Sequence, residues 1–317
     1  MTSHSSSSAS PAEGAKTAVA AASRWSLGTW WSLIKASVSS WLDDYAPSMG
    51  AALSYYTVFS LAPLLVIVVS VAGLVFGTEA VRGEVFGQIA GLMGAEAAQG
   101  IQDMLAAVSR PSTGLLGAVA GGAVLLIGAT TVFGELQDAL DRIWRAPVRH
   151  KTSGWWALVR ARLLSFGMIM GVAFLLLVSL VISAAISALG KWWAGWFQGW
   201  EAVAQVIDVI VGFGLTTAVF ALIYKVMPRV KVGWGDVWVG AAVTALLFTM
   251  GRFLIGLYIG KTGVASGFGA AGSIAVVFVW VYYSAQVFLL GAEFTWVYAE
   301  RLGSRRDVTS ATSTADR

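Results

Sequence analysis

Six long apolar stretches divide the chain. They cover roughly residues 48–77, 114–134, 163–190, 203–227, 237–260 and 272–299. A helix that crosses a bilayer needs about 20 mostly apolar residues, and each stretch reaches that length. Backbone groups in a bilayer must find their hydrogen-bond partners within the protein, which favours helices here. The pattern predicts an all-α, polytopic membrane bundle with six transmembrane helices.

Two further segments show helical periodicity outside these stretches. The segment over residues 24–45 has apolar positions at helical spacing, opposite Ser and Lys, which predicts an amphipathic helix on the cytoplasmic face. Those positions are Trp30, Ile34, Val38, Trp41 and Tyr45. Residues 79–110 mix apolar positions with acidic and small residues. We expect two short helices there that cap the outer face. A solvated helical loop is the simpler interpretation and a gating element the alternative.

The ends of the chain differ from the apolar middle. Residues 1–23 are rich in Ser and Ala and lack the basic start and compact apolar core of a signal peptide. We expect disordered tails at residues 1–23 and 303–317. One membrane domain then remains over residues 24–302.

Composition supports a membrane location. Of the 317 residues 57% are hydrophobic and 12% are charged, about half of the roughly 25% charged residues that are usual in soluble domains. The 15 Trp residues fit the aromatic belts of membrane interfaces. The absence of Cys excludes disulfides and thiolate metal sites.

Positive charge follows the connections and predicts an orientation. Sixteen of the 21 Lys and Arg residues lie in the N-terminal segment, the second and fourth connections and the C-terminal tail. The opposite connections contain only Arg82, Arg110, Lys191 and Lys261, and Arg252 lies within a span. Cytoplasmic connections carry the excess of Lys and Arg. The distribution therefore predicts that both termini are cytoplasmic, and it requires an even number of spans.

Motifs of soluble enzymes carry little weight in this chain. Residues 267–272, GFGAAG, match a dinucleotide fingerprint that has meaning only between a strand and a helix. Gly260-Lys261-Thr262 ends like a phosphate loop, but the required earlier Gly is Ile255. With His4 and His150 as the only imidazoles, we expect no cofactor, no metal site and no catalytic residues.

A basic stretch over residues 142–162 could be mistaken for a nucleic-acid surface. It interleaves Arg with Trp144, Trp155 and Trp156. The same arrangement is expected at an inner-leaflet boundary. We therefore predict membrane lipids with anionic headgroups as partners and no nucleic acid; the oligomeric state does not follow, and a homo-oligomer stays open.

Ionisable groups inside the spans are the strongest functional candidates. Each costs several kcal/mol at mid-bilayer, so such groups usually face a partner, water or the bundle interior. At about 1.5 Å per residue, Asp208 and Arg252 reach similar depths and are predicted to pair, while Glu293 and Lys225 lie toward the inner side. The full candidate polar site is Ser54, Tyr55, Tyr56, Ser60, Pro63, Asp208, Lys225, Arg252, Gln286 and Glu293. Helix locking and a substrate pathway explain these residues equally well.

Four separated segments resemble one known family. They are AALSYYTVFSLAP at 51–63, LQDALDRIWR at 136–145, MPRVKVGWGDVWVGAAVTALLF at 227–248 and GFGAAGSIAVVFVWVYYSAQVFLLGAEF at 267–294. Together they resemble the YihY/BrkB family of bacterial inner-membrane proteins, historically labelled ribonuclease BN-like. The resemblance implies six spans in the bacterial cytoplasmic membrane. It places Tyr55, Tyr56, Ser60, Pro63, Gly291, Ala292 and Glu293 on motif positions.

The resemblance also bears on function. Some members of the family are linked to envelope glycolipid export or serum resistance, which implies a transporter-like protein that moves a lipid or other amphiphile. The alternative is a non-transporting scaffold for envelope assembly. The ribonuclease label conflicts with the missing metal-ligand set, and we expect no enzyme.

Overall fold

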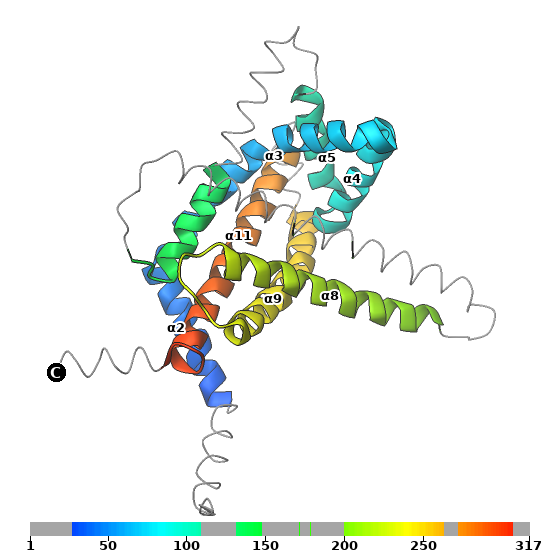
Figure 1. Cartoon of the computed structure of the whole chain (residues 1–317). Coiled ribbons are helices and arrows are strands. Elements are labelled where there is room, and N and C mark those ends of the chain that lie inside the picture. The colour runs from blue at the N-terminus through cyan, green and yellow to red at the C-terminus, as the bar shows by residue number, and fades with distance from the viewer. Residues whose placement is uncertain are drawn as a thin grey trace, which may run out of the picture.

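The computed structural model describes residues 27–108, 131–147, 171, 178, 200–262 and 272–306. Within these residues the chain forms helices and no strand. The helices are α2 (Leu27–Asp43), α3 (Ala46–Phe76), α4 (Thr78–Met93), α5 (Ala95–Val108), a helix over residues 131–143, α8 (Trp200–Val226), α9 (Trp234–Thr262) and α11 (Gly272–Arg301) (Figure 1). The prediction of an all-α protein is confirmed for this part of the chain.

The breaks between the first four helices occur at residues with positive φ. Tyr45, at φ 57°, separates α2 from α3, and Pro47 follows in the first turn of α3, where its missing N–H costs nothing. Gly77 at φ 86° ends α3, and Gly94 at φ 90° ends α4. Glycine adopts this conformation without steric cost, so the chain turns sharply at both places.

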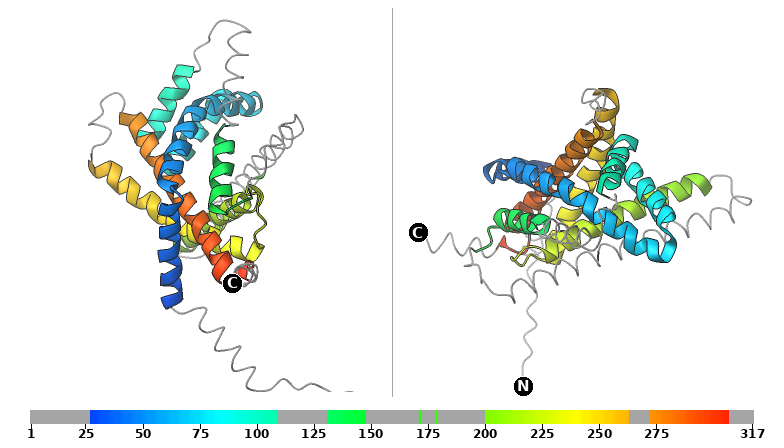
Figure 2. Two further views of the ribbon diagram at one scale, coloured as in Figure 1. Left: turned by 90° about the vertical axis from the view of Figure 1, so that its left-hand side faces the viewer. Right: turned by 90° about the horizontal axis from the view of Figure 1, so that it is seen from above.

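Helix α11 crosses the middle of the bundle. It packs against α9, α3, α5 and α2, while α8 packs against α9. The pair α4 and α5 lies toward one end of the molecule (Figures 1 and 2). The beginning of α2 and the end of α11 lie at the opposite end, which we call the α2 end. The beginning of α2 and the end of α11 therefore lie at the same end of the described bundle (Figure 2).

In the described part of the chain, three helices are long and apolar enough to cross a membrane, judged by length and composition. They are Gln205–Val226, Trp234–Tyr258 and Gly272–Arg301. The first predicted stretch forms the 31-residue helix α3. The predicted span 163–190 lies outside the described residues except for Gly171 and Val178, and of 114–134 only the last four residues are described. Six spans and cytoplasmic termini stay predictions.

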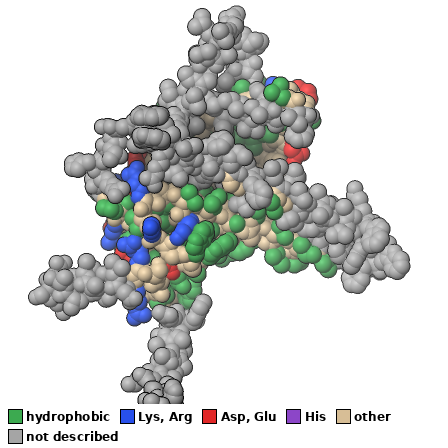
Figure 3. Space-filling view, in the orientation of Figure 1, with side chains coloured by type: hydrophobic (Ala, Val, Ile, Leu, Met, Phe, Trp, Pro, Cys, Tyr) green, Lys and Arg blue, Asp and Glu red, His purple; other side chains and the backbone are tan. Residues whose placement is uncertain are grey.

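The two largest of three apolar clusters among the described residues lie inside the bundle. The larger lies at the α2 end, and its fully buried side chains include Leu140, Trp144, Tyr224 and Leu289. The second joins α3, α5, α9 and α11, with Val58, Ile101, Ile255, Val276 and Val277 at its centre. Apolar side chains also cover the outside, as a lipid-facing surface requires. Figure 3 shows such side chains over one face, and the exposed ones include Val209, Ile210, Met250, Phe253 and Leu254.

The segment predicted to have a single apolar face is helical over α2, but its apolar side chains lie on two sides of that helix. Trp30 stacks on Phe294 of α11, and Leu33 is buried there as well. Exposed apolar side chains form a second stripe: Trp31, Ile34, Val38, Leu42 and Tyr45. One side of α2 thus packs on α11, and the other is left for the membrane interface or a neighbour.

The two helices predicted in residues 79–110 are present as α4 and α5. Helix α5 packs on α3, α4 and α11, and α4 also contacts α9. Gly100 of α5 brings that helix against the backbone of Ser273 at the start of α11. The segment is therefore a packed layer on the bundle, and its position on the outer face of the membrane stays a prediction.

Candidate functional site

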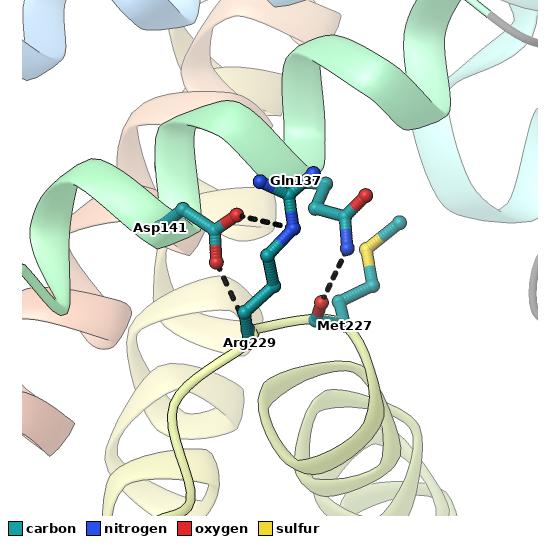
Figure 4. Close-up of polar contacts among 4 residues, drawn as sticks. All are labelled: Gln137, Asp141, Met227 and Arg229. Atoms are coloured by element: carbon teal, nitrogen blue, oxygen red, sulfur yellow. Dashed lines mark hydrogen bonds and ion pairs between the residues drawn. The ribbon is translucent and has the colours of Figure 1, made fainter. Parts of the chain in front are cut away.

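An ion pair and two hydrogen bonds fasten helix 131–143 to the α8–α9 connection (Figure 4). Asp141 Oδ1 accepts the backbone N–H of Arg229 at 2.9 Å, and its Oδ2 lies 3.3 Å from Arg229 Nε. Gln137 Nε2 donates to the carbonyl of Met227 at 3.0 Å. Burial raises the pKa of Asp141 and outweighs the lowering by the Arg229 hydrogen bond and charge. The connection is thus held at a fixed place on the helix.

A buried polar cluster joins the same helix to α8, α9 and α11. Trp144 is fully buried, and its Nε1 donates to the carbonyl of Ala292 at 3.1 Å. The Tyr224 hydroxyl donates to the carbonyl of Phe288 at 2.6 Å and lies 3.2 Å from Thr244 Oγ1. Three of the four segments that carry the resemblance therefore meet here: 136–145, 227–248 and 267–294. The remaining segment, 51–63, lies in α3.

Glu293 lies beside this cluster and is 0% exposed. Neither carboxylate oxygen has a hydrogen-bond partner among the described residues. The charged groups that act on it are, in order of effect, Asp44, Arg145 and Asp43. Almost all buried polar atoms in proteins are hydrogen-bonded, so this carboxyl requires an explanation other than packing.

Backbone strain gathers at the same place. Among the described residues, the non-glycine residues with positive φ are Tyr45 at 57° and Arg145 at 49°. Tyr45 follows Asp44, and Arg145 follows the buried Trp144. Such conformations cost about 1–3 kcal/mol each and cluster at functional sites. They place the two charged neighbours of Glu293 on sharp turns.

Cations supported by aromatic rings surround the α2 end. Arg142 lies over Tyr45 at 5.6 Å, and Arg305 lies over Trp296 at 4.7 Å. Lys225 and Lys35 lie over Trp234 and Trp31 at 5.2 and 5.4 Å. Figure 3 shows Lys and Arg side chains gathered over this part of the surface. Basic and aromatic side chains together are typical of a membrane–water boundary.

Asp236 fastens the beginning of α9 to the end of α11. Its Oδ2 accepts the Ser304 backbone N–H at 2.9 Å and the Ser304 hydroxyl at 2.6 Å. Gly303 lies directly against the Asp236 carboxyl, where a larger residue would not fit. The clasp holds the last turn after α11 in place beside the α8–α9 connection.

The candidates predicted on α3 make local contacts. Ser54 Oγ donates to Ala51 O at 2.8 Å, and Ser60 Oγ donates to Tyr56 O at 2.6 Å. Tyr55 is exposed, and its ring packs beside Tyr56 at 5.5 Å. Pro63 lies within α3, which continues to Phe76. In this structure the two serine hydroxyls are satisfied by their own helix.

The predicted Asp208–Arg252 ion pair is absent. Both residues are exposed, and the ion pairs between described residues are Arg82–Glu79 and Arg229–Asp141. In the stretch of α9 around Arg252 the buried residues are Gly251 and Ile255, whereas Arg252 is exposed, so Arg252 points to the outside of the bundle. The two residues match in predicted depth, but the orientation of Arg252 around its helix separates them.

Lys225 faces the α8–α9 connection, whereas Gln286 faces the same corner as Glu293. Lys225, in the last turn of α8, donates to the carbonyl of Val232 in that connection. Gln286 Nε2 donates to Pro47 O at 3.2 Å and joins α11 to the beginning of α3. Its Oε1 is buried without a hydrogen-bond partner in the described part of the chain. Gln286 and Glu293 thus face the same corner, formed by the end of α2 and the start of α3.

The sequence alone did not single out Asp44 and Arg145, two of the charged residues that act on Glu293. Asp44 ends the segment before α3, and Arg145 was counted only as part of a basic stretch. Adjacent acids directly before an apolar stretch were a usable signal. Within the described residues, no group of three or more His, Asp or Glu gathers as a metal site.

Comparison with known proteins identifies the family. Residues 37–315 match the family model described as Virulence factor BrkB. A UPF0761 membrane protein of Pseudomonas aeruginosa (strain LESB58) is 24% identical over 270 residues, which cover 84% of this chain and 63% of that protein. A UPF0761 membrane protein of Tolumonas auensis is 41% identical over 80 residues, 25% of this chain and 26% of that protein.

These matches have clear limits. The chain spans less than two thirds of the length of these curated relatives. No solved structure matches the chain. Because the family model covers well over half of the chain, and the relatives are named as membrane proteins, the chain is a membrane protein of the YihY/BrkB family.

Proposed function

We propose that the protein is transporter-like and moves a lipid or another amphiphilic envelope component across the bacterial cytoplasmic membrane. Glu293 is the observation that carries this proposal. A packed scaffold gains nothing from a fully buried carboxyl without a hydrogen-bond donor, because leaving such a group unsatisfied costs about 1–3 kcal/mol or more. Intramembrane ionisable groups of this kind typically belong to substrate or ion pathways.

Its surroundings support the same proposal. Glu293 lies where three segments of the family pattern meet, beside the strained residues Tyr45 and Arg145. The basic and aromatic rim of the α2 end supports an inner-leaflet position, with both termini cytoplasmic. Anionic lipid headgroups are the partners that such a rim suits. We propose no nucleic-acid partner and no enzymatic activity.

A non-transporting scaffold is the second candidate, and one observation favours it. Several polar side chains of the described helices are satisfied by carbonyls of their own helix. Ser54, Ser60, Thr217, Thr244 and Thr295 all donate to carbonyls of their own helices. In a scaffold Glu293 would serve only to fix the packing of α11.

Leaflet-resolved lipid analysis separates the two candidates. Cells that lack the gene would be complemented with the wild type, Glu293→Gln or the control Asp138→Asn, which changes an exposed acid on helix 131–143. We expect at least one lipid class to accumulate in the inner leaflet without the gene. Wild type and Asp138→Asn should restore its distribution, and Glu293→Gln should not.

Two results would contradict the proposal. If the distribution of every lipid class is unchanged in cells without the gene, the proposal that the protein moves a lipid is wrong. Equal complementation by Glu293→Gln would remove Glu293 from the mechanism and favour the scaffold. Purified protein that degrades RNA, with the activity lost in a point variant, would restore the ribonuclease alternative.

A further inference from the structure

Glu293 and Asp44 bring two carboxyl groups together at a buried corner. Glu293 comes from the last third of α11, and Asp44 from the turn between α2 and α3. The hydrogen bond from Gln286 Nε2 to Pro47 O holds these two elements together, and Asp44 is the charged group that acts most strongly on Glu293. Glu293 is fully buried, whereas Asp44 is half-buried. The pair therefore has one member in a dry site and one member toward solvent.

Two ionised carboxylates cannot hydrogen-bond to each other, because each has acceptors only. No other donor in the described residues reaches either oxygen of Glu293. A proton held between the two carboxyls supplies the missing donor. Paired carboxyls in other proteins share one proton for the same reason, since two like charges at contact distance cannot both persist.

The charges around the pair fit this assignment. From helix 131–143 and its last turn, Arg145 provides one positive charge; from the end of α2, Asp43 adds a negative one. With one proton the pair carries a single negative charge, which Arg145 balances. Without that proton, the fully buried Glu293 carboxylate and the half-buried Asp44 carboxylate would together face a single cation. Asp43 is exposed, so water screens its charge.

We propose that Glu293 and Asp44 form a proton-binding carboxyl pair at the junction of α11 with the α2–α3 corner. The proton bridges the two carboxyls in the closed corner and leaves to water through the half-buried Asp44. Its release leaves two carboxylates that repel each other across the corner, at the strained turn of Tyr45. The use of this proton to drive substrate movement rests on the proposed function, whereas the binding does not.

A metal ion fits the corner less well than a proton. Hard cations such as Ca²⁺ take 6–8 oxygen ligands, and the pair offers two carboxyls. No third acid or His joins them within the described residues to complete a metal-binding group. The adjacent Arg145 would also repel a cation, whereas it stabilises a pair that carries one negative charge.

Infrared difference spectroscopy of the purified full chain tests this inference without a substrate. The protein in lipid nanodiscs would be titrated from about pH 9 to about pH 5, a range above the ordinary carboxyl pKa of about 4, so that exposed acids stay ionised. The signal is the carbonyl band of a protonated carboxylic acid. We expect the wild type to show a band of a non-exposed acid that Glu293→Gln removes and Asp44→Asn shifts. Asp138→Asn should leave it unchanged.

The outcomes decide the inference in every case. A wild-type spectrum without such a band, or a band that survives Glu293→Gln, overturns it. A band that disappears when NaCl is added at constant pH also overturns it, in favour of a cation site. If Glu293→Gln does not fold, Asp44→Asn carries the same test, because its half-buried side chain tolerates an isosteric change. If the band is confirmed but the lipid distribution is unchanged, the carboxyl pair is supported and only the transport proposal is contradicted.

Discussion

Gly291 is the position where one added methyl group should disturb the site most. A Cβ at this residue would overlap Thr244 Oγ1 and crowd the Tyr224 hydroxyl. Both side chains are fully buried, so neither can move into solvent. Gly291→Ala would therefore push α11 away from α8 and α9, two residues before Glu293.

The magnitude follows from three contributions. Overpacking a well-packed core costs about 1–3 kcal/mol. Displacing Tyr224 weakens its 2.6 Å hydrogen bond to Phe288, which adds about 1 kcal/mol. The better helix propensity of Ala returns about 1 kcal/mol. We expect a net loss of about 1–3 kcal/mol.

Gly256→Ala is the matched control. Gly256 also lies in a membrane-spanning helix, α9, but nothing lies within 4 Å of its Cβ position. Ala should leave stability unchanged or raise it by up to about 1 kcal/mol. Both variants would be purified in one detergent, heated in parallel and measured by the fraction that stays monodisperse. Equal stability of the two variants, or a more stable Gly291→Ala, would refute the close approach of α11 to α8 and α9.

Three further variants test other parts of the site. Burial raises the pKa of Asp141, so the folded protein keeps this proton to higher pH than the unfolded chain; stability should fall as the pH rises above about 4. Asp141→Asn should flatten that part of the pH–stability curve and cost about 1 kcal/mol or less at neutral pH, because Arg229 is 55% exposed and the ion pair is weak. Tyr224→Phe removes a buried hydroxyl with two polar contacts, and a loss of about 1 kcal/mol is expected in the same heating assay. Asp208→Arg combined with Arg252→Asp should behave as the sum of its single variants in that assay, since no ion pair between described residues joins the two positions; rescue by the double variant would contradict this.

Hydropathy alone predicted four of the described helices closely. The stretches 48–77, 203–227, 237–260 and 272–299 correspond to α3, α8, α9 and α11, with ends that differ by at most three residues. The reason is physical: apolar length decides where a helix can lie in a bilayer. The charged or turn-forming residues that flank each stretch then end it near the same position.

The polar site was predicted less well, because the sequence gives the depth of a residue along its helix but not the direction in which its side chain points. A rise of about 1.5 Å per residue sets how far Arg252 lies from the end of α9, but not which side of α9 it occupies. Burial of Gly251 and Ile255 turns Arg252 outward. Glu293 was predicted as an intramembrane acid and is buried in α11, but the charged residues around it, Asp44 and Arg145, are 249 and 148 positions away in sequence. No local pattern reports contacts at such separation.

The position of the carboxyl pair relative to the membrane boundary explains how Glu293 can be both dry and within reach of water. Arg142 lies over Tyr45, the residue after Asp44, and Arg305 lies over Trp296, one helical turn from Glu293. Cations over aromatic rings are typical of a membrane interface, so we expect the interface at the level of these side chains. The proposed pair would then lie within about one helical turn, roughly 5 Å, of that level. At this depth a proton needs to cross only the half-buried Asp44 to reach water, whereas a mid-span acid would need a channel through the bundle. A carboxyl pair in such a position can respond to the pH on one side of the membrane while α11 stays sealed from the other.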